Sequence, residues 1–416
     1  MIDYEKELEL YRTELYENVL PFWEKYAPDT EHGGFFTCFT GNGDRLLSTD
    51  KYIWSQGRML WVLSHILKRG ELSTERAAAL ERYAHLSADF LMKHSRLENG
   101  NCVFLTDREG KKKLTGGIYD SSIYVDCFVI IGLAEYGEWC ASAEALDFAL
   151  DLYRHARGRY LSGKYNTEPY PVPKGYRTHG LPMIFTNTAR TLADALRKRG
   201  RLEADGIYDE AYGYACDIID SFVDGDGILH EMIPTEGGHD TSTLLGRYIN
   251  PGHTIEDCWF LEDEWARVGD KERHGKTLSV LKNALRLGWD TEYGGIRLFA
   301  DMTGAIPFGE IPDPDEGMVR KVTSDNTSKL WWVHSEALYS TLLFSSDPEV
   351  AEWYGRVKEY TLRTFPNREN DLGEWIQIRD REGKPENRVV ALPVKDPFHI
   401  MRNLLLLMEL CEDRIG

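Results

Sequence analysis

The sequence predicts an all-α fold, an (α/α)6 barrel with short β-hairpins at one rim. Short glycine-marked segments with alternating apolar residues recur at intervals of roughly 70 residues, and each is typical of a brief extended excursion. These segments are 32–44, 99–111, 162–172, 224–238, 293–304 and 372–384. A helix pair cannot bury both of its faces alone, so we expect six pairs to close into a ring.

Helical periodicity fills the stretches between these segments. The expected pairs are 51–69 with 73–94, 121–137 with 141–157, 180–199 with 207–223, 256–268 with 270–287, and 329–344 with 348–364. The first helix of a pair is often apolar nearly all round, which is typical of a buried helix. We expect one domain over residues 1–416. The Pro- and Asp-rich segment 305–322 is either a mobile lid over the central cleft or a plain surface connection.

Composition excludes several classes of function. The net charge of −19 argues against nucleic acid and anionic membranes as partners. We find no apolar run long enough to span a membrane, and the Glu-rich first helix is unlike a signal peptide. The seven cysteines are scattered without a CxxC motif, which favours a reducing, cytoplasmic location. Neither a zinc-type ligand pattern nor a phosphate-binding loop is present, so we expect no metal and no cofactor.

The segment Arg247–Asp263 carries the first candidate site. The turn at residues 250–252 leads into a helix, with Thr254 or His253 expected near its cap. His253 and Glu256 are three residues apart and share a helix face, so the carboxylate could orient the imidazole as a general base. The alternative is a capping pair with a buried, satisfied histidine.

An arginine in an apolar helix is the second candidate. Arg58 shares a face with Trp54 and Trp61, an arrangement suited to sugar hydroxyls or a developing oxyanion. On the next inner helix, Tyr124 and Asp126 follow, and Asp126 is the expected partner of Arg58 or of a substrate hydroxyl. The alternative for Arg58 is a structural ion pair.

Further candidates lie on the later inner helices. His179 precedes a helix that carries Asn187, a candidate for binding a hydroxyl, while Trp332 and Glu336 share one face of another helix. The last helix opens with His399 and Arg402. His334, which shares the helix of Trp332, is expected to be a core histidine.

Opposed imidazoles suit proton transfer at a carbon next to a carbonyl. His253 and His399 open helices in the fourth and sixth units, so they can face each other across one cleft.

Two rival classes of function remain open. A glycoside hydrolase would need a carboxylate pair, Asp126 or Glu256 with Glu336. A non-catalytic binding protein would gain nothing from buried histidines and a buried arginine.

Six motifs in order resemble the N-acylglucosamine 2-epimerase family: EHGGFFTC, KYIWSQGRMLW, NPGHTIEDCWFL, GWDTEYGGI, KLWWVHSEA and DPFHIMR. The resemblance runs from about residue 31 to 408. Three places depart from the family pattern, namely the segment THGLPMIFTN before Asn187, Met401 where closer relatives carry Pro, and segment 305–322.

The resemblance implies metal-independent epimerisation at C2 of an open-chain aldose in an (α/α)6 barrel. It implies that His253 and His399 are the acid/base pair, with Arg58, Glu256, Trp332 and Glu336 around the sugar, that Asn187 matches a family asparagine, and that the protein is a homodimer. The substrate is N-acylglucosamine with N-acylmannosamine, a plain hexose such as mannose or glucose, or a cellobiose-type disaccharide. An aldose–ketose isomerase is a further alternative.

Overall fold

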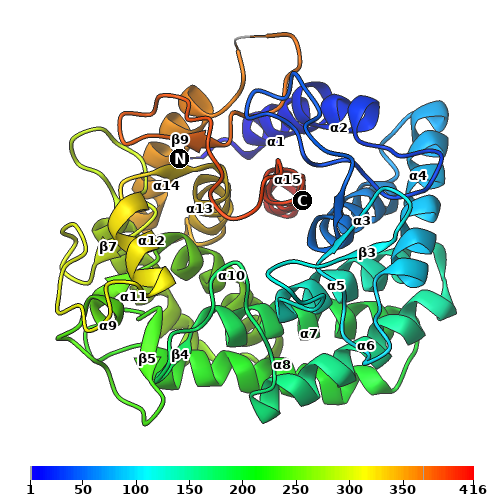
Figure 1. Cartoon of the computed structure of the whole chain (residues 1–416). Helices are drawn as coiled ribbons and strands as arrows, with labels where there is room; N and C mark the ends of the chain where they lie inside the picture. Colours follow the sequence, from blue (N-terminus) through cyan, green and yellow to red (C-terminus); the bar gives the residue numbers. More distant parts are fainter. Residues whose placement is uncertain (1, 369) are drawn as a thin grey trace.

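The computed structural model describes residues 2–368 and 370–416, and its helices form a closed ring of pairs (Figure 1). The inner helices are α3 (Ile53–Arg69), α5 (Ile123–Cys140), α7 (Gly180–Lys198), α10 (Pro251–Val268), α13 (Trp331–Leu343) and α15 (His399–Ile415). Five outer helices follow their inner partners: α4 (Thr74–His94), α6 (Ala143–Ser162), α8 (Glu203–Asp217, continued by a π-turn at Ile218–Phe222), α11 (Lys271–Gly288) and α14 (Pro348–Thr364).

The N-terminal segment closes the ring. It runs as α1 (Tyr4–Thr13), a π-helical turn (Glu14–Val19) and α2 (Leu20–Tyr26), and α1 packs against the C-terminal helix α15. The expected six-pair barrel is therefore confirmed over the described residues. The predicted helices 256–268 and 207–223 begin a few residues earlier than expected, at Pro251 and Glu203.

The rim strands pair differently from local hairpins. A strand just before an inner helix pairs with a strand after the following outer helix, which fastens the two ends of each helix pair together. These antiparallel pairs are β1 (Lys51–Tyr52) with β2 (Leu105–Thr106), β4 (Tyr176–Thr178) with β5 (Met232–Pro234), β6 (Tyr248–Ile249) with β7 (Ala300–Asp301), and β8 (Lys329–Leu330) with β9 (Ile378–Arg379). Among the described strands, only β2 and β3 (Lys112–Lys113) form a local hairpin, while isolated antiparallel bridges such as Phe39–Leu46, Val223–Leu229 and Trp289–Ile296 close short turns at other expected segments.

Two glycines let α3 and α5 approach closely. A Cβ atom on Gly57 would lie 2.2 Å from the carbonyl oxygen of Phe128, and one on Gly132 would lie 2.3 Å from the carbonyl oxygen of Gly57. Larger side chains would push the helices apart. The close contact fixes the ring of Phe128 beside α3, where the site begins.

Two buried lysines anchor the starts of α3 and α13. Lys51 Nζ lies 2.9 Å from Asp29 Oδ2, and Lys329 Nζ lies 3.3 Å from Asp290 Oδ2. Each aspartate opens the same sequence pattern, DTE followed by one residue and GG. Both lysines are fully buried, and paired charges tolerate such burial. The motifs EHGGFFTC and GWDTEYGGI therefore position the two helices that carry Arg58 and Trp332.

No described helix combines the length and apolar character needed to cross a membrane.

Candidate active site

A cavity of about 280 Å³ opens at the rim where the inner helices begin. Eight residues expected from the sequence line it: Trp54, Arg58, Tyr124, His253, Glu256, Trp332, His399 and Arg402. They come from α3, α5, α10, α13 and α15, so the ring brings together side chains that are far apart in the sequence. The remaining wall is largely apolar and aromatic.

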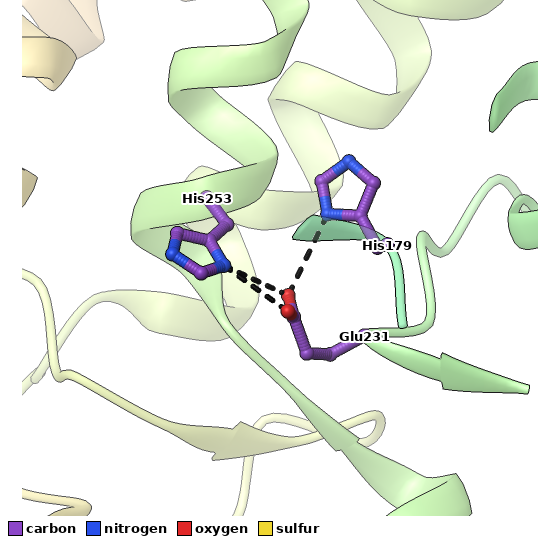
Figure 2. A group of neighbouring side chains, drawn as sticks. All are labelled: His179, Glu231 and His253. Carbon is purple, nitrogen blue, oxygen red and sulfur yellow. Dashed lines mark hydrogen bonds and ion pairs between the residues drawn. The ribbon is translucent and has the colours of Figure 1, made fainter. Parts of the chain in front are cut away.

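His253 stands in the first turn of α10. The N-cap is Asn250, whose side chain accepts a hydrogen bond from the backbone N–H of His253, so His253 and Thr254 lie in the first turn near the cap, as expected, and neither is the cap itself. Nδ1 of His253 lies 3.1 Å from both carboxylate oxygens of Glu231 (Figure 2). Glu256, the expected partner, does not contact the imidazole of His253. It lines the cavity and accepts a hydrogen bond from Arg402 of α15 instead.

Glu231 is the orienting carboxylate that the sequence reasoning missed. It immediately precedes β5 in the apolar run ILHEMI, and a charge in such a run was the signal that could have revealed it. Burial raises the pKa of Glu231, but the imidazoles of His253 and His179 lower it more, to about 2. An ionised carboxylate therefore accepts the Nδ1 proton of His253, and in this tautomer of the neutral ring the lone pair is on Nε2.

His179 lies behind Glu231, outside the cavity. Its Nε2 is 2.9 Å from Asp257 Oδ2 and its Nδ1 is 3.5 Å from Glu231 Oε2, and the side chain is fully buried. The expected contact of His179 with a sugar is therefore wrong, since two carboxylates and the protein core surround the ring.

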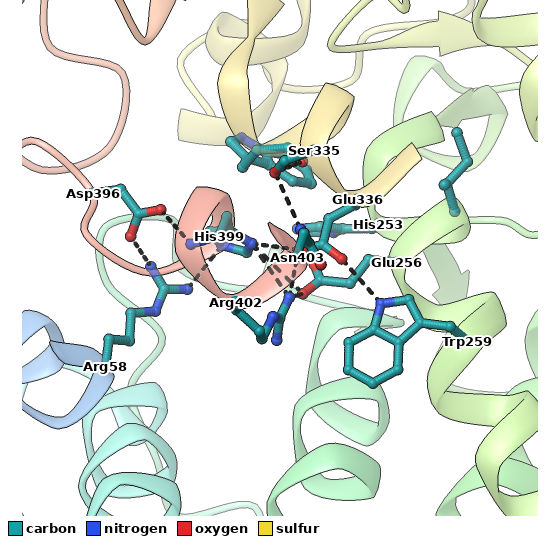
Figure 3. A network of polar contacts seen from close by, with 12 residues as sticks. Arg58, His253, Glu256, Trp259, Ser335, Glu336, Asp396, His399, Arg402 and Asn403 are labelled. Atoms are coloured by element: carbon teal, nitrogen blue, oxygen red, sulfur yellow. Dashed lines mark hydrogen bonds and ion pairs between the residues drawn. The ribbon is translucent and has the colours of Figure 1, made fainter. Parts of the chain in front are cut away.

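His399 begins α15 and has the same kind of partner. Its Nδ1 lies 2.7 Å from Glu336 Oε1, and its Nε2 faces Nη2 of Arg58 at 3.3 Å (Figure 3). Asp396 caps the helix by accepting the backbone N–H of His399 at 2.9 Å. Because Nδ1 carries the proton toward Glu336, Nε2 accepts from Arg58.

Arg402 binds two carboxylates at once. Its Nη2 donates to Glu256 and to Glu336, and Asn403 also donates to Glu336, at 2.7 Å (Figure 3). Burial raises the pKa of Glu336, but Arg402 and His399 lower it more, to about 2. Glu336 is fully buried and lies just behind His399 rather than on the cavity wall.

Arg58 lies among aromatic rings. Its guanidinium carbon is 4.0 Å from the ring centre of Phe128 and 5.0 Å from that of Trp54. Trp61 instead stacks on His65, so the expected second indole contact is wrong. Burial lowers the pKa of Arg58 to about 10, which still leaves the guanidinium charged at neutral pH. Its ion-pair partner is Asp396, at 3.3 Å.

Asp126 and Asn187 lie away from the site. Asp126 is fully buried and pairs with Arg159 at 3.2 Å, so the expected pairing with Arg58 is wrong. It projects from α5 toward the outer helix α6, away from the cavity. Asn187 is half-buried one turn beyond the cavity-lining Ile184 and is not among the described residues that line the cavity.

Trp332 contacts both imidazoles. Its ring centre is 5.3 Å from that of His253 and 5.9 Å from that of His399. The two histidines therefore lie next to one indole, each with Nδ1 against an ionised carboxylate. His334 on the same helix is fully buried and accepts the backbone N–H of Ile296, as expected for a core histidine.

Segment 305–322 contributes to the cavity. It ends inside the helix α12 (Gly317–Asp325), whose Met318 and Lys321 line the cavity. Lys321 Nζ donates to the carbonyl oxygen of Val390, from the segment before α15, at 2.8 Å, and Val390 and Ala391 also line the cavity. Segment 305–322 thus contributes to the cavity wall together with the segment before α15.

Within the described part of the chain, two groups have ligand atoms close enough to hold a metal ion. One is His179, Glu231 and His253, and the other is Glu256, Glu336 and His399. Hydrogen bonds link these residues to one another, to Arg402 and to Asp257. The expectation of no metal stays a prediction.

Comparisons with known proteins agree on one family. The family model described as N-acylglucosamine 2-epimerase (GlcNAc 2-epimerase) matches residues 34–402. An N-acylglucosamine 2-epimerase from Homo sapiens is 30% identical over 412 residues, which cover 96% of this chain and 88% of that protein. A cellobiose 2-epimerase from Dictyoglomus turgidum is 27% identical and covers 94% of this chain and 97% of its own. The solved cellobiose 2-epimerase from Spirochaeta thermophila shares the fold, with a TM-score of 0.76 at 19% identity over 99% of this chain and 98% of that chain.

Proposed function

This chain belongs to the N-acylglucosamine 2-epimerase family, and from that membership we propose that it interconverts N-acyl-D-glucosamine and N-acyl-D-mannosamine. It is a carbohydrate 2-epimerase, an isomerase that inverts one carbon of a sugar. The observation that carries the proposal is the matched pair of imidazoles next to Trp332 on one cavity wall, each backed by a carboxylate at Nδ1.

The proposed reaction has three steps. The sugar ring opens and gives the C1 aldehyde, which acidifies the proton on C2. The unprotonated Nε2 of one histidine then removes this proton, and the electrons move into an enediolate whose oxygen accepts hydrogen bonds from Arg58. The other histidine, in its protonated form, returns a proton to the opposite face of C2. In the reverse reaction the two histidines exchange the roles of base and acid.

The apolar wall supports an N-acyl sugar over a plain hexose. Met183 and Ile184 of α7, Met232 of β5, Phe299 before β7 and Met318 of α12 all line the cavity. An unsubstituted hexose would leave much of this surface against water, whereas the methyl group of an N-acyl substituent can pack on it.

The site supports hydrolysis poorly. Glu256 and Glu336 bind the same guanidinium, and Asp126 lies outside the cavity. A glycosidase needs two carboxyl groups that flank the bond, one of them protonated. The low pKa of Glu336, set by Arg402 and His399 against its burial, leaves it no proton to donate near neutral pH.

A second cavity favours a second candidate substrate. It measures about 210 Å³, adjoins the first across Trp54, Arg58 and Trp331, and runs beneath residues 386–396. A second sugar unit would fit there, so C2 epimerisation at the reducing end of a disaccharide is the alternative.

We further propose a cytoplasmic homodimer. All seven cysteines are described and free, which suits a reducing compartment. The homodimer follows from the family resemblance, and light scattering of the purified protein tests it.

The test of function is solvent-proton exchange. The protein is incubated in D₂O with N-acetylglucosamine, N-acetylmannosamine, glucose, mannose and cellobiose, and NMR follows deuterium at C2. Deuteration and inversion fastest with the N-acyl sugars support the proposal, and deuteration at C1 with ketose formation would instead identify an isomerase. Cleavage of a disaccharide without deuteration would contradict the proposal.

A further inference from the structure

The proposed reaction leaves one buried charge unused. His179 is fully buried between Asp257 Oδ2, at 2.9 Å from its Nε2, and Glu231 Oε2, at 3.5 Å from its Nδ1 (Figure 2). Burial lowers the pKa of His179, but the two carboxylates raise it more, to about 9. The ring is therefore an imidazolium at neutral pH, and it stands directly behind the carboxylate that orients His253.

The two catalytic histidines are thus backed by different cations. Behind His399, Glu336 is neutralised by the guanidinium of Arg402, which stays charged at every ordinary pH. Behind His253, the corresponding cation is an imidazole that can lose its proton. Each catalytic histidine thus has a carboxylate at Nδ1 and a cation behind that carboxylate, but only the cation behind His253 can lose its proton within the ordinary pH range.

We propose that His179 is a positioning residue, which offsets the negative charge of Glu231 and thereby limits how tightly that carboxylate holds an extra proton on His253. The inference rests on the proposed function. An unbalanced Glu231 would stabilise the doubly protonated form of His253, which cannot remove a proton from C2. With His179 charged, Glu231 still fixes the proton on Nδ1 but attracts a second proton to the ring less strongly.

Other charged or titratable groups face this cluster from the surrounding elements. Those near Glu231 or on the cavity wall beside His253 are Tyr124 on α5, Tyr248 on β6, Asp257 and Glu256 on α10, and Glu316 and Lys321 at α12. All of these side chains remain in the variants below. Burial raises the pKa of Asp257, and His179→Asn removes the cation that opposes this rise, so the variant reports the loss of the His179–Asp257 ion pair as a unit.

Two substitutions should move the titration of His253 in opposite directions. His179→Asn removes the offsetting cation and should raise the pKa of His253 by about one unit, while Glu231→Gln removes the anion and should lower it. The measurement is NMR titration of ¹³Cε1-labelled histidines, with His253→Asn to assign the signal. A loss of stability alone cannot produce shifts of opposite sign.

A matched control exists at another point of the barrel. His65 is also a histidine between two carboxylates, with 2.7 Å from Nδ1 to Glu135 and 2.7 Å from Nε2 to Glu409. His65→Asn removes a comparable buried cation and should leave the titration of His253 unchanged. A shift in this variant as large as that in His179→Asn would overturn the proposal, as would an unshifted or lowered pKa in His179→Asn.

The unmodified protein provides a test that needs no variant to fold. At pH 7.5, the ring ¹⁵N shifts of His179 should be those of an imidazolium, and those of His253 a neutral ring protonated at Nδ1. A neutral His179 would overturn the proposal. Because these readouts need no turnover, failure of the proposed sugar chemistry would show in the D₂O exchange test while leaving the titrations unaffected.

Discussion

Glu231 and His253 form the orienting pair of the α10 histidine, with 3.1 Å between Nδ1 and each carboxylate oxygen. They are 22 positions apart in the chain and come from different elements of the rim. Glu336 and His399 form the equivalent pair 63 positions apart, at 2.7 Å. The site therefore depends on contacts between units of the ring rather than on neighbours along one helix.

Glu231→Gln should lower kcat by roughly 10²-fold, because a neutral amide neither fixes the Nδ1 tautomer nor supports the basicity of His253. The acid limb of the pH–rate profile should move to lower pH. Glu256→Gln is the comparison, since Glu256 lines the same cavity but binds Arg402 and lies 3.8 Å from Nδ1 of His399. That variant should displace the acid limb less than Glu231→Gln does. An equal displacement in both would return Glu256 to the role expected from the sequence.

Arg58→Lys should reduce kcat by roughly 10²-fold with little change in melting temperature. Lysine keeps a charge for Asp396 but lacks the planar fork that faces both Asp396 and Nε2 of His399. Arg159→Lys is the control, because Arg159 also pairs with a buried aspartate yet lies outside the cavity. Steady-state kinetics and thermal unfolding of both variants distinguish a catalytic from a structural role. A lower melting temperature with normal turnover in Arg58→Lys would show that Arg58 is structural.

The ring of helix pairs was predictable because its signals are local and repeated. Apolar helices such as α5, and the glycine-marked segments between pairs, are visible in the sequence without any long-range information. Strand pairing was not predictable in the same way. In four strand pairs of the described chain the partner lies beyond two helices, so the sequence pattern favoured local hairpins, which appear there as the β2–β3 pair and as isolated bridges at other segments.

The cavity wall was predicted better than the contacts behind it. A polar residue near the start of an apolar inner helix, such as Arg58, is predicted from the sequence to be buried and to face the central cavity at the rim. Which carboxylate meets which histidine depends on the angles between neighbouring helices. His253 and Glu256 share a face, yet the ring places Arg402 next to Glu256 and Glu231 next to His253.

Gly252→Ala should lower kcat by about tenfold. A Cβ atom there would lie 2.6 Å from Cη2 of Trp332, so the indole next to both imidazoles must move, and small displacements at a site cost rate. Tryptophan fluorescence should change together with kcat. Gly158→Ala, on the outer helix α6 with open space around the new methyl group, should leave both unchanged. Unaltered kinetics in Gly252→Ala would show that the position of Trp332 is not critical.

Stability should fall as pH rises from about 6.5 to 9, in part because of His65. Burial lowers the pKa of His65, but Glu135 and Glu409 raise it more, to about 9. A raised pKa in the folded state contributes stability that is complete below the unfolded pKa near 6.5 and is lost as pH approaches 9. The contribution is on the order of 3 kcal/mol. Denaturant unfolding at several pH values should give His65→Gln a shallower slope than the parent, and parallel slopes would contradict the assignment.

The two histidines should divide proton exchange between the epimers. His253→Asn and His399→Asn should both lose inversion, because inversion needs a base on one face of C2 and a donor on the other. Each variant should still exchange the C2 proton of one epimer slowly with D₂O, and the two variants should prefer opposite epimers. The reason is geometric: the proposed reaction places C2 between the two imidazoles that line the cavity, so the remaining imidazole meets the C2 proton of one configuration.

Ring opening must be separated from proton abstraction in this experiment. If one histidine also assists opening, its variant would lose exchange for a second reason, so the open-chain fraction of each sugar is measured and equilibrated before the protein is added. His334→Asn is the control and should retain inversion. This buried histidine of α13 hydrogen-bonds to the backbone of Ile296 and Leu330 in the core. Exchange of the same epimer by both site variants, or full inversion by either, would point to a single base with an intermediate that rotates between two faces. The second histidine would then bind substrate rather than transfer a proton.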